Sequence, residues 1–464
     1  MATFENALGA VNDILWSYIL IVLLIGCAVL FTLRTRFVQF RMIGEMVRLL
    51  IHPDKKPGDG RKHISSFQAF VVALASRIGT GNLAGVATAI SVGGPGAVFW
   101  MWVMALLGSS LSFVECTLAQ LYKRKTKDAF IGGPAYYMKY GLRKGWLAVT
   151  FAVLMIMTFG LAYSIVQSNT ICAACEKAFG FDHVIMGVII TVLSVGTLFG
   201  GIHRVAKVSS AIVPFMAVAY LILAVGILIY NINLLPSVIV TIVRDAFGFD
   251  QAMGGALGIT VIQGIKRGLF SNEAGEGSSP NAAATATVSH PVKQGLIQAL
   301  GVFTDTLVVC SCTAFIILLS GADYTAASGI QLTQEAISSQ IGGIGNPFVA
   351  LLIWMFAFSS IIGNSYYGET NVLYLTRSRA ALTAYRLAVG VIVMLGAVLS
   401  LDVVWGLSDV TMALITACNL AAITPLSGQA IFLLRDYVRQ KREGKNPTFS
   451  REQMPEVADR IEAW

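Results

Sequence analysis

Residues 79–85, Gly-Thr-Gly-Asn-Leu-Ala-Gly, interrupt an apolar run that would otherwise form one continuous helix. Glycine adopts backbone conformations closed to other residues and lets a ligand approach the main chain. Within a membrane, such irregular backbone is tolerated only where it packs inside protein or lines a cavity. Small residues could instead serve close helix packing, but packing does not account for Arg77 and Asn82 beside the glycines. The stretch predicts a broken helix whose N–H groups can receive an anion such as a carboxylate.

The rest of the chain has the composition of a polytopic membrane protein. Of 464 residues, 56% are hydrophobic and 12% are charged, and the mean hydropathy is +0.72. Soluble domains carry about 25% charged residues. Apolar runs of about 20 residues, enough to cross about 30 Å of hydrocarbon, recur throughout. Because no long hydrophilic stretch leaves room for a second domain, residues 1–464 are interpreted as a single membrane domain.

Eleven transmembrane spans are predicted, which makes the fold all-α. Their ranges are 13–33, 66–91, 95–122, 146–175, 183–201, 206–232, 255–287, 293–320, 347–376, 383–401 and 408–434. Several exceed the minimum length, so tilt, kinks or breaks are expected. The first span is not typical of a cleavable signal peptide, because Glu5 and Asp13 precede its apolar core and no Lys or Arg does.

Basic residues predict the orientation, because cytoplasmic loops are enriched in Lys and Arg. The largest groups are Arg34, Arg36, Arg41, Arg48, Lys55, Lys56, Arg61 and Lys62; Lys123, Arg124, Lys125, Lys127, Lys139, Arg143 and Lys144; and Arg435, Arg439, Lys441, Arg442 and Lys445. Smaller clusters at Arg204, Lys207, Arg377 and Arg379 fall on the same side. An odd number of spans then places the N-terminus outside and the C-terminal tail, residues 435–464, in the cytoplasm. The net charge of +8 is an orientation signal and does not call for nucleic acid as a partner.

Seven cysteines lie mostly inside apolar spans, and they are expected to be small buried thiols. Cys172 and Cys175 have the spacing of a redox motif. They have no second cysteine pair and no nearby histidine, so metal or disulfide chemistry is the lesser alternative.

The sequence contains a weak internal repeat at an offset of roughly 190 residues, because Asn82-Leu83-Ala84-Gly85 matches Asn272-Glu273-Ala274-Gly275. One extra helix at 13–33 would precede two five-span halves, 66–232 and 255–434. An odd number of spans gives the halves opposite orientations. Inverted repeats of this kind are typical of secondary transporters, whose sites lie where corresponding helices are interrupted.

The second interruption is residues 268–281, Gly-Leu-Phe-Ser-Asn-Glu-Ala-Gly-Glu-Gly-Ser-Ser-Pro-Asn, in the seventh span. An exposed loop is the alternative, but apolar or small side chains flank the segment and its counterpart lies in a span. A dipolar ligand suits the pair of breaks. Its carboxylate could meet the N–H groups near Thr80 and Gly81, and its ammonium could meet carbonyls freed near Phe270 and Ser271.

Several ionisable residues fall inside predicted spans, where charge is costly and usually paired. We expect one mutually compensating set, with structural ion pairing at least as plausible a role as ligand contact. Its members are Arg77, Lys266, Arg267, Glu273 and Glu276, with Glu115 and Asp305 as further candidates.

The ninth span carries a candidate cation site. Ser359 and Ser360 stand three and four residues after Phe356, on one helical face, so two hydroxyls and a carbonyl could converge on a sodium ion. Serines bonded to their own helix are the equally weighted alternative. In the fourth span, the polar cluster 167–169 could line the cavity or tie helices together.

With these features in place, the sequence resembles the alanine or glycine:cation symporter family, within the amino acid, polyamine and organocation superfamily. The resemblance covers nearly the whole chain. Its most specific segments are GTGNLAGVA, GGPGAVFWMW, GGPAYYM, RGLFSNEAGEGSSPNAAA and FAFSSI. The resemblance implies a leucine-transporter-like 5+5 inverted repeat with one extra N-terminal helix, and sodium-coupled import of small neutral amino acids by alternating access across the bacterial cytoplasmic membrane.

The resemblance also implies roles for particular residues. The substrate-binding residues would be Gly79, Thr80, Gly81, Gln167, Phe270, Ser271, Asn272 and Asn364. The sodium ligands would be the carbonyls of Ala75, Ile78 and Phe356 and the hydroxyls of Ser359 and Ser360. Sodium is the coupling ion, and no organic cofactor is expected. Two departures from the family pattern, Arg77 and Asn364, affect ion stoichiometry and side-chain selectivity respectively.

Other functions were weighed against symport. Proton coupling or a larger neutral amino acid would fit the same fold. A membrane-embedded hydrolase could use Glu273 and Glu276 as acid and base and Ser271 as nucleophile, but the chain has no HExxH, GxSxG or GxxxxGK[ST] motif. A channel is disfavoured because two corresponding breaks favour alternating access. The chain is therefore predicted not to be an enzyme.

Overall fold

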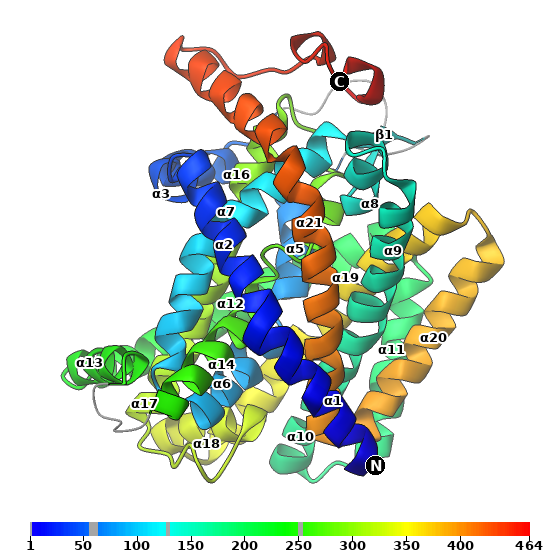
Figure 1. The fold of residues 1–464 in the computed structure, drawn as a ribbon. Helices are drawn as coiled ribbons and strands as arrows, with labels where there is room; N and C mark the ends of the chain where they lie inside the picture. Colours follow the sequence, from blue (N-terminus) through cyan, green and yellow to red (C-terminus); the bar gives the residue numbers. More distant parts are fainter. Residues whose placement is uncertain (1, 55–63, 127–129, 249–253) are drawn as a thin grey trace.

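The computed structural model describes residues 2–54, 64–126, 130–248 and 254–464, and nearly all of them belong to one bundle of helices (Figure 1). The two ends of the described chain lie at opposite ends of this bundle. Five of the basic residues used to predict the orientation lie outside the described residues. They are Lys55, Lys56, Arg61, Lys62 and Lys127.

The bundle is built from the following elements. The first part contains α1 (Ala2–Ile14), η1 (Leu15–Leu20), α2 (Ile21–Arg34), α3 (Val38–Arg41), α4 (Ile43–Ile51), α5 (Ser66–Arg77), η2 (Gly81–Gly85), α6 (Val86–Gly93), α7 (Ala97–Leu121), β1 (Arg124–Lys125), β2 (Phe130–Ile131), α8 (Pro134–Tyr136), η3 (Tyr137–Gly141), α9 (Gly145–Met155), η4 (Ile156–Ala162), α10 (Tyr163–Phe179), α11 (His183–Leu198), α12 (Gly201–Tyr230) and α13 (Leu235–Ala246). The second contains α14 (Gly254–Asn272), α15 (Ser279–Ala283), α16 (Pro291–Val302), η5 (Phe303–Cys310), α17 (Ser311–Leu319), α18 (Gly329–Ile341), η6 (Gly342–Ile344), α19 (Gly345–Leu375), α20 (Arg379–Val398), α21 (Leu401–Arg442), η7 (Arg451–Gln453) and η8 (Ala458–Arg460).

Every predicted span falls mainly on helices, although the number of crossings stays a prediction. Among the described residues, eight helical segments are long and apolar enough to cross a membrane, and the bent pair 66–77 and 81–93 would make a ninth. Helix α11 is apolar but short, and the polar seventh span does not meet the same criterion. The sequence did not predict α3, α4, α13 or α18, and α1 begins well before the predicted start at residue 13.

The first predicted break is present. Helix α5 ends at Arg77, Ile78 is extended (φ −76°, ψ 92°), and the chain resumes at η2 with a bend of 49° between the two helical parts. The Asn82 side chain accepts a hydrogen bond from the Gly79 N–H at 3.0 Å. The amide side chain therefore satisfies a backbone donor that the broken helix leaves open.

The second predicted break is longer and lies between α14 and α15. Gly275 and Gly277 have φ values of +92° and +79°, which glycine adopts without steric cost. Glu273 has a φ of +55°, an uncommon conformation for a residue with a Cβ atom. The fold therefore holds Glu273 in a strained conformation at the start of the break.

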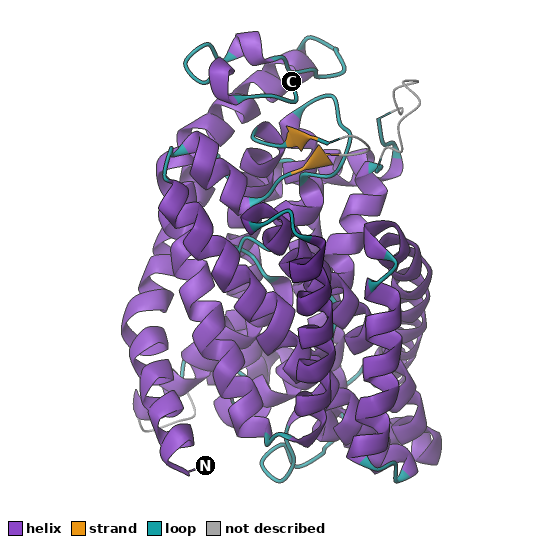
Figure 2. Ribbon diagram, turned by 90° about the vertical axis from the view of Figure 1, so that its right-hand side faces the viewer, coloured by secondary structure: helices purple, strands orange, loops and turns teal. Residues whose placement is uncertain are grey.

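The end of the bundle that carries the C-terminus holds the only strands in the described chain, a two-stranded antiparallel ribbon of β1 and β2 (Figure 2). Helix α21 extends to Arg442, so the predicted tail from 435 begins as helix. The segment after it folds back onto the bundle. Phe449 N–H donates to the Ser289 carbonyl at 2.9 Å, and the Trp464 indole donates to the Gln120 carbonyl at 2.8 Å.

Candidate functional site

The first helix break is in contact with the last turn of α14, immediately before the second break. A Cβ atom placed on Gly81 would lie 3.0 Å from the Ser271 Cα and 3.1 Å from Cδ1 of Phe270. A larger side chain at position 81 would fit only if α14 moved away by a few tenths of an ångström. The close approach explains why glycine occupies position 81. It also brings together the segments 79–85 and 268–281, which the sequence relates only through a weak internal repeat.

The N–H groups of the first break already have an acceptor. Gln167 on α10 accepts hydrogen bonds through Oε1 from the Thr80 N–H at 3.0 Å and from the Thr80 hydroxyl at 2.6 Å. This oxygen stands where the sequence predicts a ligand carboxylate oxygen. Gln167 is 3% exposed, so it occupies this position inside the protein and not at its surface.

Two serines and three carbonyls converge beside Gly79. The Ser360 hydroxyl lies 3.0 Å from the Ala75 carbonyl, 3.1 Å from that of Phe356 and 3.4 Å from that of Ile78. The Ser359 hydroxyl lies 2.8 Å from the Phe356 carbonyl and 3.4 Å from that of Ala75. Helix α19 supplies Phe356 and both hydroxyls, while α5 and the break supply the other carbonyls. Oxygen ligands of this kind suit a hard cation.

The cation candidate and the first break share a wall. A Cβ atom on Gly79 would overlap the Ser360 hydroxyl oxygen and would lie 3.0 Å from the Gln167 Oε1. Gly79 is therefore the point where the carbonyl and hydroxyl cluster meets the N–H groups of the break.

Phe270, the predicted side-chain contact, lies within an aromatic group. Its ring centroid is 4.7 Å from that of Tyr163 and 4.8 Å from that of Trp405, and the tilted ring of Phe159 lies 4.7 Å from that of Tyr163. These rings limit the space beside the breaks. Sequence reasoning missed Tyr163 and Trp405, which lie in other spans and carry no motif.

An ion cluster covers the aromatic group on the side of α1. Asp409 on α21 lies 3.0 Å from the Lys266 Nζ and 2.7 Å from the Arg267 Nη2, and the Arg267 guanidinium stacks on Trp405 at 4.2 Å. A cavity of about 320 Å³ begins at these residues and is lined by α1. The ion cluster thus separates that cavity from Phe270. The sequence does contain one signal for the ion cluster, because Asp409 is a carboxylate within an apolar span.

The expected single set of compensating charges is wrong. Lys266 and Arg267 pair with Asp409, whereas Arg77 donates to the Gln298 carbonyl at 3.1 Å, to Ser112 at 3.2 Å and to Ser279 at 2.6 Å. Within the described ranges, no carboxylate lies at ion-pair distance from Arg77. The guanidinium instead crosslinks α5, α7, α15 and α16 through neutral acceptors.

The buried carboxylates hold the irregular backbone and its neighbours. Glu115 on α7 accepts from the Gly275 N–H at 3.3 Å, from the Gly277 N–H at 3.2 Å and from the Asn419 amide at 2.8 Å. Hydroxyl and amide groups satisfy the others. Glu273 accepts from Ser76 and Ser278, Glu276 accepts from Tyr163, and Asp305 accepts from Ser271 and Asn82.

Two predicted substrate residues lie to the side of the Gly79–Gly81 contact. Asn272 donates to Thr306 at 3.2 Å and accepts from the Ala274 N–H at 3.1 Å, so it stabilises the turn that follows α14. Asn364 lies 2.5 Å from the Ser76 hydroxyl, and its Nδ2 has no partner in the part of the chain that is described. The structure therefore groups Gly79, Thr80, Gly81, Gln167, Phe270 and Ser271, with Asn364 close to α5.

The seven cysteines are free thiols, and Cys172 and Cys175 form no disulfide. In the described residues, no group of three His, Cys, Asp or Glu side chains is arranged to hold a metal ion. The carbonyl and hydroxyl cluster is a different kind of candidate, because its oxygens come from neutral groups.

Two interrupted helices that meet inside a helical bundle define the class of the protein, a secondary transporter. The chain resembles a mutant of the manganese transporter of Eremococcus coleocola, with a TM-score of 0.54 and 16% identity over 88% of this chain and 87% of that one. It resembles MhsT in complex with L-phenylalanine with a TM-score of 0.50 and 12% identity, over 86% and 93% of the respective chains. These likenesses show the leucine-transporter fold predicted from the sequence.

The chain belongs to the sodium:alanine symporter family, whose model matches residues 1–451. It is 50% identical over 461 residues to the probable sodium/glutamine symporter GlnT of Bacillus subtilis, covering 99% of this chain and 96% of GlnT. The amino-acid carrier protein AlsT of Bacillus subtilis is 46% identical, over 99% and 98% of the two chains. The sodium/alanine symporter AgcS of Methanococcus maripaludis is 36% identical, over 96% and 99%.

Family membership confirms the predicted class. The protein is a multi-pass amino-acid symporter of the cell membrane and not an enzyme, so the hydrolase alternative is wrong. The roles of individual site residues remain predictions.

Proposed function

We propose that the protein imports small neutral amino acids, alanine and glycine, together with sodium by alternating access. In this proposal the N-terminus faces outward, and residues 66–232 and 255–434 are the two inverted halves. The proposal rests on one observation: Gly81 of the first break packs against the end of α14, where the second break begins, and a cluster of carbonyl and hydroxyl oxygens adjoins the first break at Gly79. The cation and the zwitterion would thus bind in adjacent positions.

Sodium would bind among the carbonyls of Ala75, Ile78 and Phe356 and the hydroxyls of Ser359 and Ser360. This ion would link α5 to α19 and fix the carbonyl of Ile78, which immediately precedes the N–H groups of the break. Ordering that segment before the amino acid arrives reduces the free-energy cost of its binding. Each ligand would therefore raise the affinity for the other by the same factor, as linkage requires.

The substrate carboxylate would replace the Gln167 Oε1 on the Thr80 N–H and hydroxyl. A charged oxygen forms stronger hydrogen bonds with these donors than a neutral amide does, so the exchange is favourable. The displaced Gln167 would then line the cavity. The substrate ammonium would lie near the carbonyls of Phe270 and Ser271.

The substrate side chain would face Phe270, Tyr163 and Trp405. A binding site bounded by these three aromatic rings would exclude bulky side chains by steric overlap. One methyl group changes binding by only about 1 kcal/mol, so the site would discriminate poorly between alanine and glycine.

A larger neutral amino acid, glutamine, is the second candidate. GlnT, at 50% identity, is named for glutamine, and the Asn364 Nδ2 near the site has no partner in the described chain. Proton coupling is the alternative for the ion, because a relative from Bacillus sp. PS3 is named a sodium/proton-dependent alanine carrier.

Uptake into proteoliposomes tests both parts of the proposal. Labelled alanine should accumulate when sodium is higher outside, and not when choline replaces sodium at the same pH. Equal uptake in both conditions would overturn sodium coupling, and uptake that follows a pH gradient alone would establish proton coupling. Competition by unlabelled glycine, alanine and glutamine ranks the substrates. Competition by glutamine stronger than by alanine would replace the first candidate with the second.

A further inference from the structure

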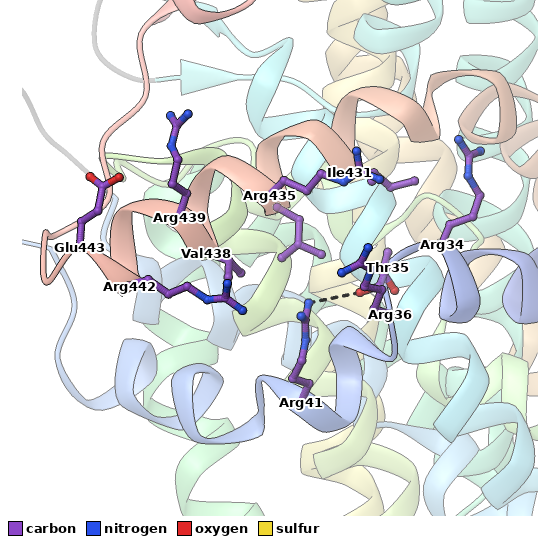
Figure 3. Close-up of a pocket in the computed structure, with 11 residues that line it drawn as sticks. Arg34, Thr35, Arg36, Arg41, Ile431, Arg435, Val438, Arg439, Arg442 and Glu443 are labelled. Atoms are coloured by element: carbon purple, nitrogen blue, oxygen red, sulfur yellow. Dashed lines mark hydrogen bonds between the residues drawn. The ribbon is translucent and has the colours of Figure 1, made fainter.

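A concave surface on the end of the bundle that carries the C-terminus is rich in arginine. It is a cavity of about 650 Å³ between the α2–α3 segment and the last turns of α21 (Figure 3). Arg34, Arg36 and Arg41 line one side, and Arg435, Arg439 and Arg442 line the other. We call these six residues the arginine cavity.

Little within the protein neutralises the arginine cavity. Arg34 donates to the Ser427 hydroxyl, Arg41 to the Thr35 carbonyl, and Arg439 pairs with Asp436. In the described chain, the guanidinium groups of Arg36, Arg435 and Arg442 have no hydrogen-bond or ion-pair partner. The one acidic side chain in the lining, Glu443, pairs with Lys445 at 2.7 Å.

Nearby carboxylates on adjacent elements are also engaged elsewhere. Glu45 on α4 pairs with Arg48 at 2.6 Å and with Lys441 at 3.5 Å, and Asp436 faces His290 as well as Arg439. Asp54 pairs with Lys293 at 2.6 Å. The arginine cavity therefore has a surplus of positive charge that an anion from outside the protein can balance.

The surface beside the arginine cavity is apolar and exposed. Leu33, Phe37 and Phe40 are 57%, 49% and 46% exposed, and Ile43 and Val47 continue the apolar surface along α4. Arg36 and Phe37 both have φ values of +56°, and this tight turn sends α3 and α4 across the end of the bundle. A short crosswise segment with apolar residues beside basic ones is typical of the boundary between lipid headgroups and acyl chains.

We propose that the arginine cavity binds the phosphate headgroup of an anionic phospholipid whose acyl chains lie along Leu33, Phe37 and Phe40. Guanidinium groups bind phosphate oxygens in a bidentate manner, and basic pockets between helices at a membrane surface are suited to such headgroups. A soluble phosphate would satisfy the charges but would leave the adjoining apolar surface uncovered. The combination of an arginine-lined concavity and exposed aromatic rings therefore favours a lipid.

The bound lipid would connect the first transmembrane helix to the last. Arg36 lies beyond the end of α2 and Arg435 lies in the last part of α21, so one headgroup would contact both. Helix α21 also carries Trp405 and Asp409 beside the candidate site. The lipid would not touch the transported amino acid. It would act by stabilising the position of α21, which contributes Trp405 to the proposed site.

The test compares lipids and variants on the purified full-length protein. Thermal unfolding and native mass spectrometry are measured with phosphatidylglycerol, cardiolipin, phosphatidylethanolamine and inorganic pyrophosphate. The two anionic lipids should raise the unfolding midpoint and remain bound, whereas phosphatidylethanolamine should not. Stabilisation by pyrophosphate equal to that by cardiolipin would overturn the lipid assignment in favour of a soluble anion.

The variant Arg36→Gln/Arg435→Gln/Arg442→Gln should weaken cardiolipin binding about tenfold or more. A matched control, Lys144→Gln/Arg377→Gln/Arg379→Gln, removes the same charge from exposed positions and should retain binding. If the triple variant fails to fold, Arg435→Gln/Arg442→Gln, which leaves the turn at Arg36 intact, provides the same comparison. Equal loss of binding in the control would show general surface attraction and would overturn the proposal.

Discussion

The two helix breaks lie close together, because the first packs against the end of α14 where the second begins, yet their backbones are held in different ways. At the first break, neutral amides accept the N–H groups: Asn82 binds Gly79, and Gln167 binds Thr80. At the second, the Glu115 carboxylate binds the N–H groups of Gly275 and Gly277. One carboxyl group holds both N–H groups of the second break, and the Asn419 amide holds that carboxyl group in turn. In the proposed function, the first break would therefore exchange its acceptor for a ligand, while the second would be a fixed platform against which the ligand is held.

Removing the carboxylate from the second break should have the largest effect. Glu115→Ala leaves two buried N–H groups without an acceptor and removes one of the two acceptors of the Asn419 amide, which keeps the Gly275 carbonyl, so the free energy of unfolding should fall by about 4 kcal/mol. Thermal unfolding in detergent and the yield of folded protein measure this loss. Glu115→Gln retains one acceptor oxygen and should fall between wild type and Glu115→Ala. An unchanged unfolding midpoint for Glu115→Ala would contradict the platform role.

Placing a charge at the first break should abolish transport without unfolding the protein. Gln167→Glu introduces a carboxylate where the substrate carboxylate is expected, and the repulsion should reduce alanine uptake about a hundredfold. The measurement is uptake at saturating sodium, normalised to protein abundance. Gln167→Ala serves as the control, since it frees the Thr80 N–H without adding charge and should retain much of the uptake. Equal loss in both variants would indicate a structural role for Gln167.

Removing one oxygen from the proposed sodium site should have a smaller and more selective effect. Ser360→Ala should raise the half-saturating sodium concentration about tenfold, because one of five ligands is lost. Ser365 is a matched control on the same helix, since its buried hydroxyl has no partner in the described residues. Ser365→Ala should leave sodium dependence unchanged. A normal sodium response in Ser360→Ala would remove that hydroxyl from the ligand set.

The smallest expected effect concerns the end of α7, the helix that carries Glu115. Burial lowers the pKa of Lys123 to about 7, and repulsion from the charge of Lys125 contributes to this shift. Unfolded lysine has a pKa of about 10.4, so between these values the unfolded state binds more protons, and stability should rise with pH. Unfolding midpoints measured from pH 7 to pH 9 should rise more steeply in wild type than in Lys123→Met. Identical slopes would show that Lys123 does not titrate in this range.

Sequence reasoning located the first break, the second break and the paired serines, because each is encoded by neighbouring residues. Glycines around Thr80 predict irregular backbone, and the spacing of Phe356, Ser359 and Ser360 places oxygens on one helical face. The structure brings all three segments together, which a weak internal repeat could suggest but not establish.

Contacts between distant spans could not be predicted in the same way. Asp409 pairs with Arg267 across 142 residues of chain, and no local pattern connects them. Gln167 was predicted to line the cavity, but its hydrogen bonds to Thr80 depend on how α10 packs against the break. The prediction of one mutually compensating set of charges was wrong because it also depended on contacts between distant spans. Arg77 donates to neutral acceptors on three other helices.

The position of Gly79 has a consequence for genetics. A Cβ atom there would overlap the Ser360 hydroxyl of the proposed sodium site and would approach the Gln167 Oε1 less closely. A bacterial selection for resistance to a toxic alanine analogue should therefore recover substitutions at Gly79 that behave as ion mutants. Such strains would regain sensitivity when the medium contains more sodium, whereas strains altered at Phe270 would not.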